Sequence, residues 1–134
     1  MRVFLDTNVL VSAFVSRGLC TEIFELVLLA HDLIVGRNVL RELEKALRLK
    51  VRLSVARSTE IIDFVSSEAV QVVDEAEPAI AEADAADARV LGEALAGKAE
   101  LFVTGDAALL QLATVGALSI VSPRQFWEVL RASN

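Results

Sequence analysis

The sequence predicts an α/β protein in which helices cover both faces of a parallel sheet. Short runs of Val, Ile and Leu recur along the 134 residues, and helical segments separate them. Strands that alternate with helices are typical of βαβ units, whose crossovers place helices on both faces of a sheet. The runs are almost wholly apolar, as expected for strands that are buried on both sides. An apolar content of 54% suits one domain with a substantial core, spanning residues 1–134.

Five buried strands are predicted, and a turn residue or a polar residue ends most of them. The first, VFL, stops at Asp6, and the second, DLIV, closes at Gly36. Pro78 breaks the chain after the third strand. The fifth precedes a helix that begins at Pro123, because proline favours the first turn. The five strands are Val3–Leu5, Asp32–Val35, Val70–Val73, Leu101–Val103 and Leu118–Val121.

Helices are predicted between the strands, where apolar residues recur every three or four positions. Thr21 is the expected N-cap of the second helix and Ser58 that of the fourth, because their hydroxyls can accept a hydrogen bond from the first turn. Gly97 ends an alanine-rich helix, and Gly116 ends a short one. The helical segments are residues 8–15, a segment that follows Thr21, then 38–49, 58–66, 84–96, 106–113 and 123–130.

Composition and charge limit the classes of function. The net charge of −6 disfavours unspecific binding to nucleic acid, but residues 37–57 hold seven basic and two acidic side chains. No apolar run is long enough to cross a bilayer, and the N-terminus lacks the pattern of a signal peptide. Cys20 is the single cysteine, so no disulfide can form within the chain. We therefore expect a cytoplasmic protein with no membrane partner.

Two carboxylates are predicted at the edge of the sheet where the parallel strands end. Asp6 directly follows the first strand, and Asp106 closes LFVTGD just past the fourth, with the Thr104 hydroxyl at the same edge. Glu42 lies one turn into the helix after the second strand, and Asp87 lies in the first turn of the helix before the fourth. Ligands of open parallel sheets bind at this edge. These four acids are therefore candidate catalytic and metal-binding residues.

A divalent cation would allow such a group of carboxylates to stay ionised together. Like charges in one cleft raise each other's pKa unless a positive charge lies among them. Mg²⁺ and Mn²⁺ take oxygen ligands, whereas zinc sites use His and Cys, which the pattern does not offer here. Read singly, Asp6, Asp87 and Asp106 suit helix starts, and Glu42 suits a solvated helix face. Asp84, one turn before Asp87, is better suited to a helix cap than to a ligand.

Four segments together resemble the PIN-domain ribonuclease family. They are FLDTNVLVSA, VLRELEKAL, DAADARVLGEAL and LFVTGDAALLQL, in the family's order and spread over nearly the whole chain. The closest resemblance is to the VapC-like toxins of toxin–antitoxin pairs. For the fold, it implies a three-layer α/β/α sandwich around the central five-stranded parallel sheet. It also implies a homodimer and a cognate antitoxin protein as partner.

The resemblance assigns an activity and a role to individual residues. Members of the family hold one or two Mg²⁺ or Mn²⁺ ions and cut RNA with metal-activated water, leaving a 5′-phosphate and a 3′-hydroxyl. Asn8 corresponds to the polar residue that supports the first acid, and Thr104 to the Ser or Thr before the fourth. The four acids of the family correspond here to Asp6, Glu42, Asp87 and Asp106.

The chain departs from the family pattern at two places. Many members carry an extra aspartate directly before the third acid, where this chain has Ala86. Asp84 either substitutes for it as a supporting residue or only caps the helix. The loop Leu49–Leu53 lacks the Pro-Lys-Phe pattern that is common in this branch, so the resemblance does not carry over the choice of RNA.

Basic side chains three or four residues apart line one face of the helix that carries Glu42. They are expected to steer the phosphate backbone of RNA toward the metal. An acidic segment of an antitoxin, or solvent alone, would suit the same face. These residues are Arg37, Arg41, Lys45 and Arg48.

Two other functions remain open from the sequence. Phosphatases of the haloacid-dehalogenase type also begin with a strand that ends on an aspartate, and Asp6 would then be a nucleophile. That chemistry needs a downstream lysine near the phosphate, and Lys98 lies at a helix end away from the acids. A non-catalytic PIN-like binding module is the alternative from another class, and the presence of all four acids disfavours it.

Overall fold

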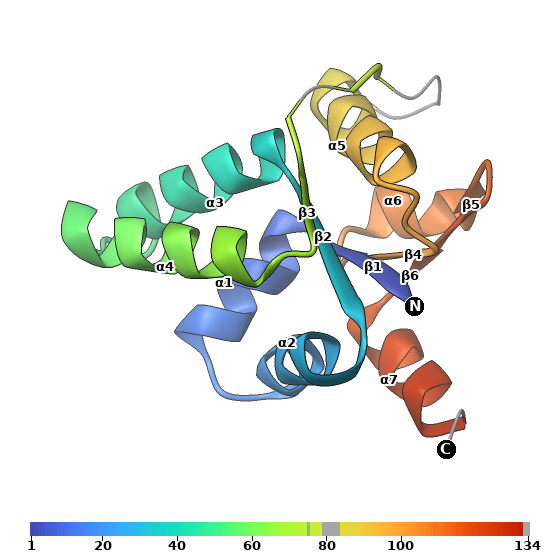
Figure 1. Ribbon diagram of the computed structural model, residues 1–134, viewed down its shortest axis with the longest axis horizontal. Helices are drawn as coiled ribbons and strands as arrows, with labels where there is room; N and C mark the ends of the chain where they lie inside the picture. Colours follow the sequence, from blue (N-terminus) through green and yellow to red (C-terminus); the bar gives the residue numbers. More distant parts are fainter. Residues whose placement is uncertain (75, 79–83, 133–134) are drawn as a thin grey trace.

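Helices lie on both sides of a central sheet in the computed structural model of the protein, which describes residues 1–74, 76–78 and 84–132 (Figure 1). Helices α1, α3 and α4 lie on one side of the sheet, and α5 and α6 lie on the other. The strands are β1 (Arg2–Leu5), β2 (Asp32–Gly36), β3 (Gln71–Val73), β4 (Leu101–Val103), β5 (Thr114–Val115) and β6 (Leu118–Val121). The helices are α1 (Thr7–Val15), α2 (Leu19–Ala30), α3 (Arg37–Leu49), α4 (Val55–Glu68), α5 (Ala85–Ala96), α6 (Ala107–Leu112) and α7 (Pro123–Ala132).

The sheet confirms the predicted α/β class but has six strands in its described part, not five. Its order is β3-β2-β1-β4-β6-β5, and every neighbouring pair is parallel except β5 with β6. The missed strand, β5, has two residues and forms a hairpin with β6 through Gly116, whose φ is +59°. Two residues are too few to show a period, so periodicity carried no strand signal there.

Strand β1 lies at the centre of the sheet and fixes where the site can form. Phe4 pairs with Ile34 of β2 on one side and with Phe102 of β4 on the other, and the rings of Phe4 and Phe102 stack 5.3 Å apart. The connections run outward from β1 to β2 and β3, and then return to β4 on its other side. Such a reversal is the switch point at which parallel sheets bind ligands. The pairing of Leu5 with Val103 brings the residues after β1 and β4 together.

Two predicted helix caps are wrong. Helix α2 begins at Leu19, and the hydroxyl of Thr21 donates instead to the carbonyl oxygens of Ala13 and Ser16. Helix α4 begins one turn earlier than predicted, because Ser54 accepts the hydrogen bond from its first turn. Ser58 is buried within α4 instead. In both cases a residue of suitable chemistry was present, but the chain had already become helical before it.

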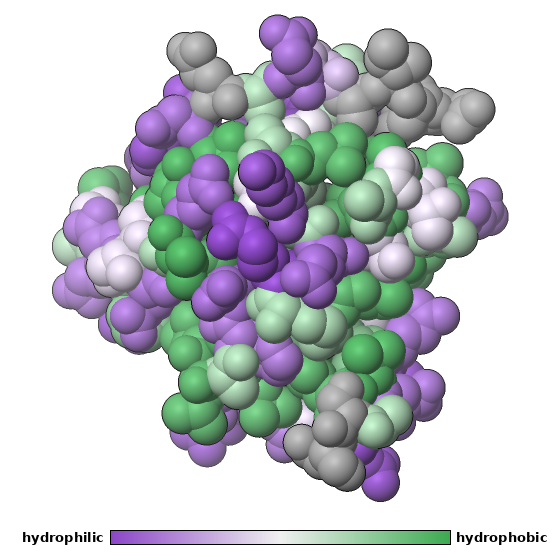
Figure 2. All heavy atoms as spheres, turned by 45° about the vertical axis from the view of Figure 1, so that its right-hand side comes forward, coloured by the Kyte–Doolittle hydropathy of each residue, from purple (hydrophilic) through white to green (hydrophobic). Residues whose placement is uncertain are grey.

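The surface mixes polar and apolar side chains. On the face shown in Figure 2, hydrophilic side chains gather in the middle and hydrophobic surface lies to either side of them. Leu29 and Leu49 are among the large apolar residues exposed to solvent, at 84% and 65% exposure. No helix in the described part of the chain combines the length and the apolar content needed to cross a membrane.

Candidate metal centre in an acidic cleft

Asp6 is a buried carboxylate at the end of β1, and it is also the N-cap of α1. It is 8% exposed, and one of its oxygens accepts a hydrogen bond from the Thr7 amide at 2.8 Å. The other oxygen accepts from the Thr104 hydroxyl at 2.7 Å and from the Asn8 amide nitrogen at 3.2 Å. Burial raises the pKa of Asp6. The hydrogen bonds from Thr104 and Thr7 partly offset this rise, and the charges of Glu42 and Asp106 add to it. Asp6 therefore combines a fixed orientation with an unfavourable negative charge.

Asp106 is held next to Asp6 by the turn that follows β4. Its amide donates to the Thr104 hydroxyl at 3.0 Å, so that one hydroxyl bridges the two aspartates. One carboxylate oxygen of Asp106 caps α6 by accepting from two amides of the first turn. The side-chain oxygen of Asn8 accepts from the Gly105 amide at 2.9 Å. Asn8 and Thr104 thus join the two strand ends, and their role as supporting residues remains a prediction.

Glu42 and Asp87 reach the same place from two different helices. Glu42 on α3 accepts a hydrogen bond from the Thr7 hydroxyl at 2.9 Å, not from a neighbouring base on its own helix. Burial raises the pKa of Asp87 on α5, and the charges of Asp84, Asp106, Asp6 and Glu42 raise it further. A carboxylate that senses all of these charges lies within their common field.

One open cleft of about 440 Å³ is bordered by all four predicted acids. Residues from α1, α3 and α5 and from the turn after β4 form its walls. Its lining consists of Asp6, Thr7, Asn8, Val11, Ser12, Glu42, Ala46, Lys50, Asp87 and Asp106. The structure therefore brings the four acids together, while their roles remain a prediction.

Asp84 caps α5 and does not border this cleft. Its carboxylate accepts from the Asp87 amide at 2.8 Å, the bond expected of an N-cap. Of the two roles left open by the sequence, the structure shows the cap. Asp84 still acts on the site, because its charge contributes to the raised pKa of Asp87.

The chemistry of the cleft suits a hard divalent cation. Carboxylates, hydroxyls and a side-chain amide offer oxygen, and neither His31 nor Cys20 lines the cleft. The acidic side chains stand apart from one another: within the described residues, no three acidic, histidine or cysteine groups cluster closely enough to hold an ion. Repulsion between like charges opposes closer approach, and a cation among them would remove that repulsion.

The predicted basic face of α3 is partly occupied by ion pairs. Arg37 pairs with Asp74 at 2.6 Å, and Arg48 lies 3.7 Å from Glu44 on the same helix. Arg41 and Lys45 make no ion pair with any described residue. Within the predicted face, only the middle therefore offers positive charge without an ion pair to a described residue.

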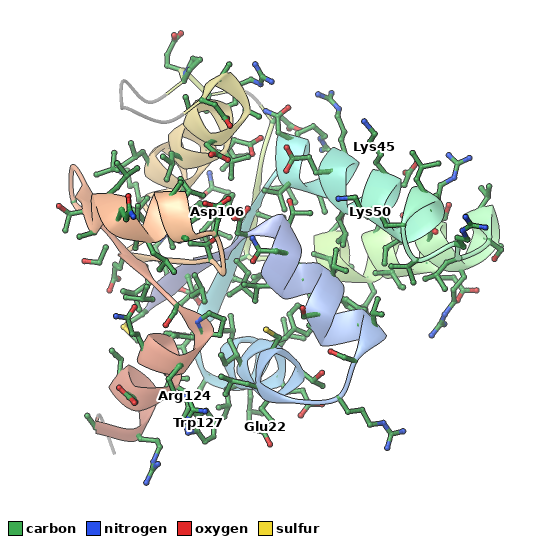
Figure 3. All side chains as sticks on the ribbon, turned by 180° about the vertical axis from the view of Figure 1, so that it is seen from behind. Glu22, Lys45, Lys50, Asp106, Arg124 and Trp127 are labelled. Carbon is green, nitrogen blue, oxygen red and sulfur yellow. The ribbon has the colours of Figure 1, made fainter. Side chains whose placement is uncertain are left out.

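Sequence reasoning missed Lys50, which lies at the end of α3 and borders the cleft itself. In Figure 3, Lys50 and Asp106 lie on opposite sides of the start of α1. Lys50 is the one cation among the described residues that line the cleft. The helical spacing of basic residues along α3 did not indicate Lys50, because Lys50 is the residue at which that helix ends. Thr7 was missed as well, although it lies in the same DTN motif as Asp6 and Asn8.

A third missed residue, Glu93 of α5, caps helix α3 from a neighbouring helix. It is 1% exposed, and one oxygen accepts from the Asn38 amide at 2.8 Å and from the Asn38 side chain at 3.3 Å. Burial raises the pKa of Glu93, and the hydrogen bonds from Asn38 partly offset the rise. A β carbon at Gly36 would overlap the carboxylate. An acid within the apolar run VLGEALA, together with a glycine before α3, was the available signal.

Comparison with known proteins identifies relatives of the chain by sequence and by fold. The family model of the PIN domain matches residues 2–108, which include all four acids of the cleft. No curated protein matches the chain. Among solved structures, the chain is similar to one in the crystal structure of VapBC2 from Rickettsia felis bound to a DNA fragment from their promoter. The TM-score is 0.64 at 15% identity, covering 91% of this chain and 98% of that one. The chain belongs to the PIN-domain family.

Proposed function

We propose that the protein is a metal-dependent endoribonuclease that hydrolyses RNA phosphodiesters at the acidic cleft. The observation that carries this proposal is the convergence of Asp6, Glu42, Asp87 and Asp106 on one cleft. Their charges raise the pKa of Asp6 and of Asp87 beyond what burial does alone. A fold stabilised only by helix caps has no need of four mutually repelling carboxylates.

The four carboxylates would hold Mg²⁺ or Mn²⁺. When bound, such an ion supplies positive charge beside the phosphodiester and acidifies water. Thr104 and Asn8 keep the Asp6 carboxylate aimed into the cleft through bonds of 2.7 and 3.2 Å. The raised pKa values of Asp6 and Asp87 favour proton uptake without the metal, so metal binding would release protons.

The wider assignment is that of a toxin in a toxin–antitoxin pair, working in the cytoplasm as a homodimer. Membership of the PIN-domain family supports it, and so does a fold shared with a chain of a VapBC2 complex. The unpaired Arg41 and Lys45 lie on the helix that carries Glu42, where they would guide RNA toward the cleft. The same membership favours a nuclease over the phosphatase alternative.

A non-catalytic binding module is the second candidate, favoured by the absence of a tight three-ligand cluster among the described side chains. RNA cleavage with Mn²⁺, followed by EDTA, separates the two functions. We expect the wild type to cut RNA with Mn²⁺ and to stop with EDTA. Asp6→Asn and Asp106→Asn should each abolish cleavage while remaining folded.

Asp63→Asn provides the matched control, because Asp63 is an exposed aspartate on α4, outside the cleft. It should cut RNA at the wild-type rate. RNA that is bound but left intact by the wild type would favour the binding module. Release of phosphate from small esters would favour the phosphatase. Unfolding of both Asp6→Asn and Asp106→Asn would indicate that these acids act as structural caps.

A further inference from the structure

A second recess, of about 320 Å³, opens directly beside the acidic cleft. The two hollows share four residues, so they form one continuous surface at the start of α1 and along α3. The recess is lined by Thr7, Glu42, Lys45, Ala46, Leu49 and Lys50. It therefore extends the site away from Asp6 and Asp106, toward the C-terminal end of α3.

The recess combines positive charge with an exposed apolar side chain. Neither Lys45 nor Lys50 has an ion-pair partner among the described residues. Leu49 lies between them in the sequence, and 65% of it is exposed, which leaves most of an aliphatic side chain open to a ligand. Two lysines beside an apolar surface suit a ligand that has an anionic part and a flat apolar part.

The opposite side of the acidic cleft differs in charge. A hollow of about 260 Å³ there has no cation among its described lining residues, which are Asn8, Val9, Ser12, Cys20, Gly105, Asp106 and Pro123. A polyanion that lies across the acidic cleft therefore meets lysines only on the side of the recess. This asymmetry places the phosphate contacts on the side of α3.

We propose that the recess binds the nucleotide next to the phosphate that is cut, as an unpaired residue of single-stranded RNA. This rests on the proposed function. The Lys50 ammonium bonds the neighbouring phosphate, and Leu49 packs against the base. Lys50 offsets the repulsion between that phosphate and the four acids, because it borders both hollows. A base paired in a duplex is stacked and cannot enter such a recess.

Binding of a fluorescent single-stranded RNA in EDTA tests this assignment without cleavage. Lys50→Gln should weaken binding and reduce the slope of log affinity against log salt by about 0.7, the value for one lost phosphate contact on a single strand. Lys50→Arg should retain the slope. Leu49→Ala should weaken binding without changing the slope, and it should leave the fold intact because the side chain is exposed.

Lys98→Gln is the control, since Lys98 is an exposed lysine that lines neither hollow. It removes the same charge and should bind like the wild type. An unchanged affinity and slope in Lys50→Gln would overturn the assignment and leave these lysines to an acidic protein partner. Wild-type protein that binds no RNA, or that binds a duplex equally well, would also overturn it.

The outcome is separable from that of the proposed function. A reduced slope in Lys50→Gln supports the subsite even if Mn²⁺ gives no cleavage, in which case the nuclease proposal alone fails. Metal-dependent cleavage with an unchanged slope in Lys50→Gln would refute the proposed subsite and leave the nuclease proposal standing.

Discussion

Replacement of Glu93 tests whether helix α3, which carries Glu42, depends on a cap supplied by α5. The N-cap residue of α3 is Gly36, which has no side chain to accept a hydrogen bond. The Glu93 carboxylate accepts a hydrogen bond from the amide of Asn38, the second residue of the helix. An ordinary N-cap side chain accepts from this position or the next. Glu93 of α5 thus supplies the hydrogen-bond acceptor that Gly36 lacks.

The magnitude follows from two losses and one gain. Removing an N-cap acceptor costs about 0.5–2 kcal/mol, and removing one buried methylene costs about 0.8 kcal/mol. Relief from burying a carboxylate, one of whose oxygens has no described partner, offsets part of this. We expect Glu93→Ala to lose about 1.5 kcal/mol of unfolding free energy, within the range for loss of a cap. At a slope of about 2 kcal/mol per molar urea, the unfolding midpoint falls by about 0.7 M.

Glu93→Gln separates hydrogen bonding from charge. Its amide oxygen can still accept from Asn38, so its midpoint should stay close to that of the wild type. Because burial raises the pKa of Glu93 above its ordinary 4.5, the stabilisation linked to its proton is complete below that pH and is lost as pH rises through the native pKa. The stability of Glu93→Gln relative to wild type should therefore improve as pH rises from 4.5 through the native pKa of Glu93.

Urea unfolding followed by circular dichroism measures both effects, and Gly36→Ala completes a double-mutant cycle. Alone, that substitution should destabilise the protein, because the new methyl group would overlap the Glu93 carboxylate. Combined with Glu93→Ala, it should cost little further. A wild-type midpoint in Glu93→Ala, or additive losses in the double variant, would refute the capping role.

Two further predictions concern the cleft. In EDTA, the raised pKa values of Asp6 and Asp87 make the folded protein the better proton acceptor, so their contribution to stability should grow as pH falls through the native pKa values and be complete below the ordinary 3.8. Asp87→Asn should lose its part of this pH dependence in urea titrations, and a variant with the full pH dependence of the wild type would contradict the prediction. Thr104→Val removes the hydroxyl that joins Asp6 to the Asp106 amide, so it should lower the free energy of unfolding by about 1–3 kcal/mol. It should also weaken Mn²⁺ binding, measured by calorimetry, and an unchanged affinity would make Thr104 only a packing residue.

Much of the acidic cleft could be predicted because it depends on local pattern. An apolar run that stops at Asp6, and another that stops at Thr104, place both residues at strand ends whatever the order of the strands. Parallel strands align those ends at one edge of the sheet. The helix before β4 must start at that same edge, which brings Asp87 there. Glu42 follows from the same reasoning applied to α3.

Residues whose partners are distant in the chain could not be predicted in this way. Glu93 accepts hydrogen bonds from Asn38, 55 positions earlier, and Thr7 donates to Glu42 across 35 positions. No local period records such pairs. The position of Lys50 in the lining is of the same kind, because it depends on how the end of α3 lies against α1.

By itself, the sequence determined the α/β class, the residues at which β1 and β4 end, and the edge of the sheet at which the four acids lie, because periodicity and chain breaks act over a few residues. The tertiary structure alone decided that β1 lies between β2 and β4, that a two-residue strand ends the sheet, and that Glu93 caps α3. These features depend on contacts between segments far apart in the chain, which packing of the whole core selects.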